Sequence, residues 1–189
     1  MKKILLEIKK KHLPFENRAV ESIDFISDKC INIDVNRIEY LRGEASNIAM
    51  DNEMVDIVFS NAVLEHVHDV GKAISEISRV TKKGGMGIHE IDLRDHFFQS
   101  TPLRLLQYPD WLWNLMGWYR PGYTNRLRFS DFLSLFNSVG FLEKKMEITR
   151  KFHGDVLYIK KHKNFSRYPM EELKILSFQV LLKKNDTGM

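Results

Sequence analysis

The segment from residue 55 to residue 93 constrains the fold more than any other part of this sequence. It begins with Val55–Ser60 (VDIVFS), an almost continuously apolar run that is typical of a parallel strand covered on both faces. Val70–Lys82 then places apolar side chains at helical spacing, with charged side chains on the other faces. Met86–Leu93 (MGIHEIDL) returns to strand character. Strands joined through a helix predict an α/β domain with a parallel sheet.

Further elements are expected on both sides of this segment. Gly84 and Gly85 are expected to end its helix, and a second helix is expected to run from its N-cap, Ser130, to Gly140. Apolar and β-branched runs predict more strands, which span residues 3–8, 19–26, 37–42, 141–149 and 177–183. A chain of 189 residues with 43% hydrophobic and 29% charged side chains fits one globular domain.

The sequence lacks the signs of secretion or of a membrane span. Its single cysteine, Cys30, has no partner for an internal disulfide, and Met1–Lys11 lacks the long apolar segment of a secretory signal. Its apolar runs are far shorter than the ~20 residues that cross a bilayer. We therefore expect a cytoplasmic protein without a membrane span.

The net charge of +4 first suggests a nucleic-acid partner. The lysines, however, are scattered in short clusters along the chain, and no known nucleic-acid-binding motif accompanies them. Scattered charge usually solvates a surface. We therefore expect no specific nucleic-acid partner.

Ordered motifs within Ile38–Gly85 carry a family resemblance. The acidic–Ala pair Glu44 and Ala45 is followed by a strand that ends near Ser60 and Asn61, then by LEH and by RVTKKGG. In this order and spacing the segment resembles the type 11 group of class I S-adenosylmethionine-dependent methyltransferases. The closing motif departs from the family's R-V-L-K-P-G-G in two places, where the chain has Thr and Lys.

A second block narrows the resemblance. HEIDLRDHFF begins at His89 and NRLRFSDFLSLFNSVGF begins at Asn125. Both are similar to a bacterial subgroup associated with glycan or surface-polysaccharide biosynthesis. The single domain thus has a poorly matching segment (residues 1–36), a recognisable core (37–149) and a C-terminal strand region (150–189).

The resemblance implies a Rossmann-like sheet with helices on both faces and S-adenosylmethionine as the cofactor. In the family strand order 3-2-1-4-5-7-6, the first strand is central. Lys3–Ile8 is expected to take that place, and a sheet left open there is expected to self-associate. By the family pattern, Glu44 and Ala45 would bind adenine and Asn61 would lie near the methionine part. Asp24 would hold the ribose hydroxyls, or is a solvated turn residue.

The glycine-rich cofactor loop of complete family members has no counterpart here. Only glycine allows the backbone to approach the cofactor closely, yet the first glycine of the chain is Gly43. Glu7 matches the first acidic residue of the loop, but the bulky Lys9–Lys11 follows it. The sequence is therefore expected to be incomplete or altered at its N-terminal strand and loop, as a fragment, a misplaced start or a pseudoenzyme.

Candidate catalytic groups follow the expected strands. A base that accepts a hydroxyl proton would be His66, His96 or Asp92, with Asp95 as an alternative. For His66, a packing role stays open beside catalysis. Aromatic residues between 108 and 123 would form a capping core or stack on a sugar. The dispersed histidines predict no metal site.

These features favour methyl transfer to a small-molecule or glycan acceptor, with activity uncertain because the glycine loop is absent. A noncatalytic fragment or pseudoenzyme that acts as a binding module is the alternative, and a basic nucleic-acid binder is a third hypothesis.

Overall fold

The computed structural model describes residues 23–25, 31–33, 41–118, 122–154 and 160–186. The chain divides into two compact units, Met1–Arg42 and Gly43–Met189, which are described separately. In the first unit, β1 (Ile23–Phe25) pairs antiparallel with β2 (Ile31–Ile33), so that Asp24 lies opposite Asn32.

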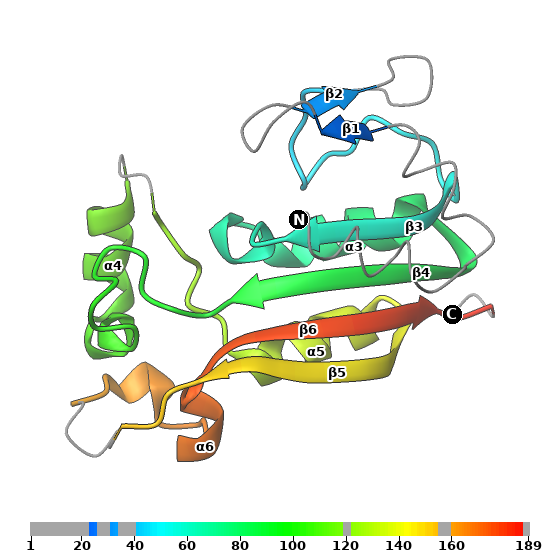
Figure 1. Cartoon of the computed structure of the whole chain (residues 1–189). Helices are drawn as coiled ribbons and strands as arrows, with labels where there is room; N and C mark the ends of the chain where they lie inside the picture. The colour runs from blue at the N-terminus through cyan, green and yellow to red at the C-terminus, as the bar shows by residue number, and fades with distance from the viewer. Residues whose placement is uncertain (1–22, 26–30, 34–40, 119–121, 155–159, 187–189) are drawn as a thin grey trace. The chain divides into compact units, whose positions relative to one another are not determined.

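The second unit is built on a four-stranded open sheet (Figure 1). Its strands are β3 (Val55–Asn61), β4 (Thr81–Asp92), β5 (Phe141–Lys151) and β6 (Ile175–Lys184), in the order β3-β4-β6-β5. β3 and β4 are parallel, whereas β6 runs antiparallel to both of its neighbours. This order equals the 4-5-7-6 half of the expected sheet and confirms the predicted fold class.

Two helices cover one face of this sheet. α3 (Val70–Val80) and α5 (Phe129–Ser138) lie side by side behind the strands in Figure 1. Alternate side chains of the strands, among them Ile91 and Phe178, are fully buried against these helices. The helices expected on the second face are not among the elements that the structure describes.

Short elements form a second apolar cluster beyond the carboxyl end of β4 (Figure 1). They are η2 (Arg104–Gln107), α4 (Asp110–Gly117), η4 (Lys163–Phe165) and α6 (Met170–Leu173). Trp113 is buried at the centre of this cluster, whereas Trp111 and Trp118 are exposed. The expected aromatic core is therefore formed by only part of the aromatic residues. Within the described residues, no helix has the length and apolar character needed to cross a membrane.

Most of the predicted elements in this unit are confirmed, with two corrections. α3 ends at Val80, before the glycines, because the chain passes directly into β4 at Thr81, whose hydroxyl donates to the Ile77 carbonyl. Ser130 is not the N-cap of α5. The N-cap is Arg128, two residues earlier, and the Asp131 carboxylate accepts the hydrogen bond of the Arg128 amide.

The strands predicted before β3 are largely untested. Lys3–Ile8, with its proposed central position, lies outside the described residues, as does most of 19–26 and of 37–42. Leu41 and Arg42 are described and are not in a strand.

Candidate functional site

The carboxyl ends of β3 and β4 bring polar residues to one rim. The last paired residues of β3 and β4 are neighbours, since Asn61 lies opposite Glu90. After β3 the chain forms η1 (Leu64–His66) and passes beside the end of β4, where the Asp92 amide donates to Glu65 Oε1 at 3.3 Å. In sheets of this kind, ligands bind beyond the carboxyl ends of the strands. The rim is therefore the candidate site.

A strained residue directs the chain from β3 into η1. Ala62 has a φ of 51°, a left-handed conformation that is unfavourable for a residue with a Cβ atom. Its amide donates to the Glu90 carbonyl at 3.0 Å, which fixes the turn against β4. Strain of this kind persists where the surrounding structure holds it, often at functional sites.

Asp92 is held by Arg94 and lies close to His96. The Arg94 guanidinium donates to both of its carboxylate oxygens, with Nε 2.9 Å from Oδ1. His96 Nε2 lies 3.4 Å from Asp92 Oδ2. Burial raises the pKa of Asp92, but the contacts of His96 and Arg94 outweigh burial and keep that pKa below its usual range. Asp92 is therefore a carboxylate held by Arg94 and close to His96, whose Nε2 makes no hydrogen bond.

Asp95 has a different role from the one considered in the sequence. Its Oδ1 accepts hydrogen bonds from the amides of Phe97 and Phe98, and the residue is buried. Asp95 thus stabilises the turn after β4. It also lines a small hollow of about 190 Å³ together with Asp92, Arg94, His96 and Gln99.

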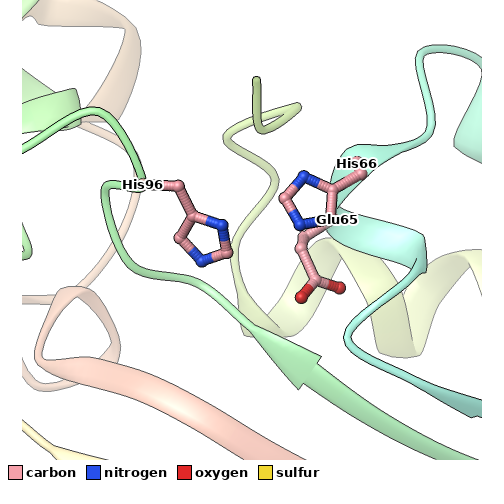
Figure 2. A group of neighbouring side chains, drawn as sticks. All are labelled: Glu65, His66 and His96. Carbon is pink, nitrogen blue, oxygen red and sulfur yellow. The ribbon is translucent and has the colours of Figure 1, made fainter. Parts of the chain in front are cut away.

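The structure brings His66 and His96 together although thirty residues separate them in the sequence. Their ring centroids lie 4.9 Å apart, and in Figure 2 the rings face each other beside the Glu65 carboxylate. His66 Nδ1 lies 2.6 Å from the Tyr123 carbonyl. Because a carbonyl only accepts, this nitrogen donates, and Nε2 is the nitrogen left for another partner.

Glu65 is the residue of this group that sequence reasoning missed. Its side chain is 2% exposed, and Oε2 has no hydrogen-bond partner. Burial raises the pKa of the Glu65 carboxyl, although backbone hydrogen bonds oppose the shift. The only available signal was its place in the LEH motif, next to His66.

A larger hollow of about 570 Å³ lies among α4, η4 and residues 125–127. Its lining combines aromatic rings, amides and guanidinium groups, and includes Trp113, Asn114, Asn125, Arg126, Asn164, Phe165, Arg167 and Tyr168. Asn125 connects the hollow to η1, because its backbone amide donates to the Glu65 carbonyl at 2.8 Å. Its side-chain amide donates to the Leu64 and Val67 carbonyls. Asn125 thus links the lining of the hollow to the backbone around η1.

The predicted cofactor residues are only partly brought together. Glu44 is exposed and Ala45 half-buried, in a turn closed by a hydrogen bond from the Asn47 amide to the Glu44 carbonyl. Asn61 is exposed at the end of β3. Asp24 lies within β1 in the other unit, and its side chain is outside the described residues.

The described residues do not by themselves fit S-adenosylmethionine. A complete site requires a glycine turn that lets the backbone approach the cofactor. Gly43, the glycine next to Glu44, has no atom within 4 Å of the place of a Cβ, so it is not part of such a close-packed turn. Glu44 and Asn61 therefore supply only isolated polar groups toward a cofactor.

Comparisons with known proteins match part of this chain. A family model described as a methyltransferase domain matches residues 11–88, and so reaches into the segment that the sequence motifs match poorly. A malonyl-acyl carrier protein O-methyltransferase from Yersinia pestis is 42% identical over 48 residues. That alignment covers 25% of this chain and only 18% of the Yersinia protein.

Solved structures share the fold at low sequence identity. An S-adenosylmethionine-dependent methyltransferase from Mesorhizobium loti has a TM-score of 0.52 and 14% identity, over 78% of this chain and 70% of that one. A protein from Bacillus halodurans has a TM-score of 0.50 and 17% identity, over 79% and 72% of the two chains. The family match covers less than half of this chain, and the solved structures show only that the fold is shared. Both agree with the class I methyltransferase fold that the sequence motifs predict.

Proposed function

We propose that this chain is an S-adenosylmethionine-dependent methyltransferase domain that acts on a small-molecule or glycan acceptor. The observation that carries the proposal is the 570 Å³ hollow at the carboxyl end of the sheet, whose lining residue Asn125 is hydrogen-bonded to the Glu65 carbonyl in η1. In open α/β folds, this edge is where ligands bind.

The lining of the hollow suits a hydroxylated acceptor. Aromatic rings such as Trp113 and Phe165 offer flat apolar faces, and the amides of Asn114 and Asn164 can both donate and accept hydrogen bonds. Arg126 is fixed rather than mobile, because its guanidinium donates to the Leu105 and Tyr108 carbonyls. A rigid set of rings, amides and a cation matches a sugar or a similar polar small molecule.

The proposal has less support for the binding site of the methyl donor than for that of the acceptor. Because the glycine loop is absent from the sequence and the first glycine is Gly43, we propose that the N-terminal strand and loop are truncated or altered. We expect this chain to bind S-adenosylmethionine or its demethylated product far more weakly than a complete family member. Isothermal titration calorimetry measures this directly. Micromolar affinity that Glu44→Ala abolishes would contradict the expectation and indicate a complete donor site.

The acceptor side has its own test. Saturation-transfer NMR with a panel of monosaccharides and nucleotide sugars should identify ligands of the purified chain. We expect Asn164→Ala, in the lining of the hollow, to weaken their binding about tenfold. Asn137→Ala, an exposed residue of α5, is the matched control. Absence of binding, or equal effects of both variants, would refute the acceptor proposal.

Two rival functions remain distinguishable. A noncatalytic binding module is favoured by the missing glycine loop, and it would retain acceptor binding without transferring labelled methyl groups. A nucleic-acid binder is suggested by the net charge of +4. We expect binding to DNA or RNA to be weak, independent of sequence and lost near physiological salt, as fluorescence anisotropy across a salt series would measure. A sequence-selective complex at that salt would favour the nucleic-acid function.

A further inference from the structure

Three side chains with metal-ligand chemistry meet beside the rim. Glu65, His66 and His96 each offer one ligand atom, and these atoms all lie within 4.8 Å of one another. Figure 2 shows the two imidazole rings and the carboxylate turned toward a common space. Two of the residues come from η1 and the third from the segment after β4, so the fold rather than the sequence spacing creates the group.

The carboxylate of this group lacks a partner. Glu65 is 2% exposed, and Oε2 has no hydrogen bond, whereas Oε1 accepts from the Asp92 amide. A buried carboxylate oxygen without a partner is costly unless a cation or a proton neutralises it. The unpartnered Oε2 atom of Glu65 therefore indicates a positively charged ligand.

One histidine is already oriented as metal ligands usually are. In metal sites, a ligating imidazole donates its other N–H to a carbonyl or a carboxylate, which fixes the ring. His66 Nδ1 donates to the Tyr123 carbonyl at 2.6 Å, which leaves Nε2 free. His96 Nε2 lies 3.4 Å from the Asp92 carboxylate but makes no hydrogen bond, so this buried nitrogen, like Glu65 Oε2, lacks a partner.

We propose that Glu65, His66 and His96 bind one divalent transition-metal ion of the Zn²⁺ or Co²⁺ type. Two imidazoles and one carboxylate are a ligand set that such ions favour, and three protein ligands leave positions open for water or a substrate. His66 is exposed and gives the ion a path from solvent. The proposal goes beyond methyl transfer, because metal binding needs neither cofactor nor acceptor. Under it, the imidazoles are ligands rather than free bases.

Co²⁺ titration of the full, tag-free chain after treatment with a chelator tests the site. We expect one equivalent of Co²⁺ to produce visible d–d absorption, and one equivalent of Zn²⁺ to displace it in calorimetry. Glu65→Gln and His66→Gln should each weaken the affinity at least tenfold. His153→Gln, which changes an exposed histidine outside the group, should leave it unchanged.

A separate measurement shows whether each variant is still folded. His66 is exposed, so His66→Gln should retain the native near-ultraviolet circular dichroism even if Glu65→Gln does not. A natively folded chain that binds no Co²⁺ or Zn²⁺ at one-to-one stoichiometry would overturn the proposal. So would binding that His66→Gln leaves unchanged or that His153→Gln abolishes. Failure to bind S-adenosylmethionine would not affect it.

Discussion

The two faces of the same sheet have very different surroundings. On the face that α3 and α5 cover, side chains such as Phe178 and Ile91 are fully buried. On the opposite face Ile57, Phe59 and Ile88 are 40%, 63% and 37% exposed. Both sets come from neighbouring positions of equally apolar strands. An apolar strand sequence therefore predicts that a face of the sheet can be buried, but it does not predict which element covers that face.

The largest expected effect separates the two faces directly. Phe178→Ala on the covered face should lower the free energy of unfolding by roughly 3–5 kcal/mol, because it leaves a cavity among the rings of Phe129 and Phe132. Phe59→Ala on the exposed face should cost less than about 1 kcal/mol. Urea denaturation of both variants measures the difference. Equal losses would show that both faces are covered in the folded protein.

Replacing a buried polar side chain on the covered face should also lower the free energy of unfolding. Arg128 is fully buried, and its guanidinium donates to the carbonyls of Leu93, Leu173 and Ile175. Arg128→Met would leave these carbonyls without partners, so we expect a loss of roughly 2–4 kcal/mol in urea denaturation. Arg150→Met, on the exposed part of β5, should change stability by less than about 0.5 kcal/mol. A small effect at Arg128 would indicate that water reaches the carbonyls.

The covered face should make stability depend on pH through His89. The ring stacks on Phe136, and burial lowers the pKa of His89 from 6.5 to about 4. Below pH 6.5 the unfolded chain takes up a proton that the folded protein resists until about pH 4. The free energy of unfolding should therefore fall as the pH is lowered through this window, by roughly 3 kcal/mol at most.

The control for this pH effect is the variant His89→Gln. Urea denaturation between pH 7.5 and pH 4 should show a shallower fall in the variant than in the unmodified chain. Identical slopes would mean that the buried imidazole is not the source of the dependence.

The smallest effect on stability is expected on the exposed face, where the readout is association. Phe59→Ser should change the free energy of unfolding by less than about 1 kcal/mol while removing a large exposed ring. Sedimentation velocity should then show less self-association than in the unmodified chain. A variant that unfolds, or that associates as before, would argue that this face does not mediate self-association.

Much of the fold could be predicted from local sequence patterns. The periodicity of residues 70–80 and the apolar run of 55–61 determine α3 and β3, and the glycine at 140, with a φ of 86°, ends α5 as expected. The predicted end of α3 is wrong, because a β-branched residue can start a strand without a glycine break. The family resemblance, rather than periodicity, supplied the strand order.

The site was less accessible to sequence reasoning. Asp92 and His96 stand in one motif, so their proximity could be expected. The meeting of His66 with His96 requires knowing that β3 and β4 are parallel neighbours, because the segments after two such strands begin at the same edge of the sheet. The importance of Glu65 depends on its burial, and burial in a short loop leaves no periodic signature.

The position of β6 has a consequence for synthesis on the ribosome. Ile175–Lys184 is made after β4 and β5, yet it lies between them in the finished sheet. Until it emerges from the exit tunnel, β4 and β5 have no hydrogen-bonding partner between them, and the emerging strands expose amides and apolar side chains. The second unit therefore cannot complete its fold strand by strand as it is translated, and the nascent chain depends on the insertion of β6 between two strands made earlier.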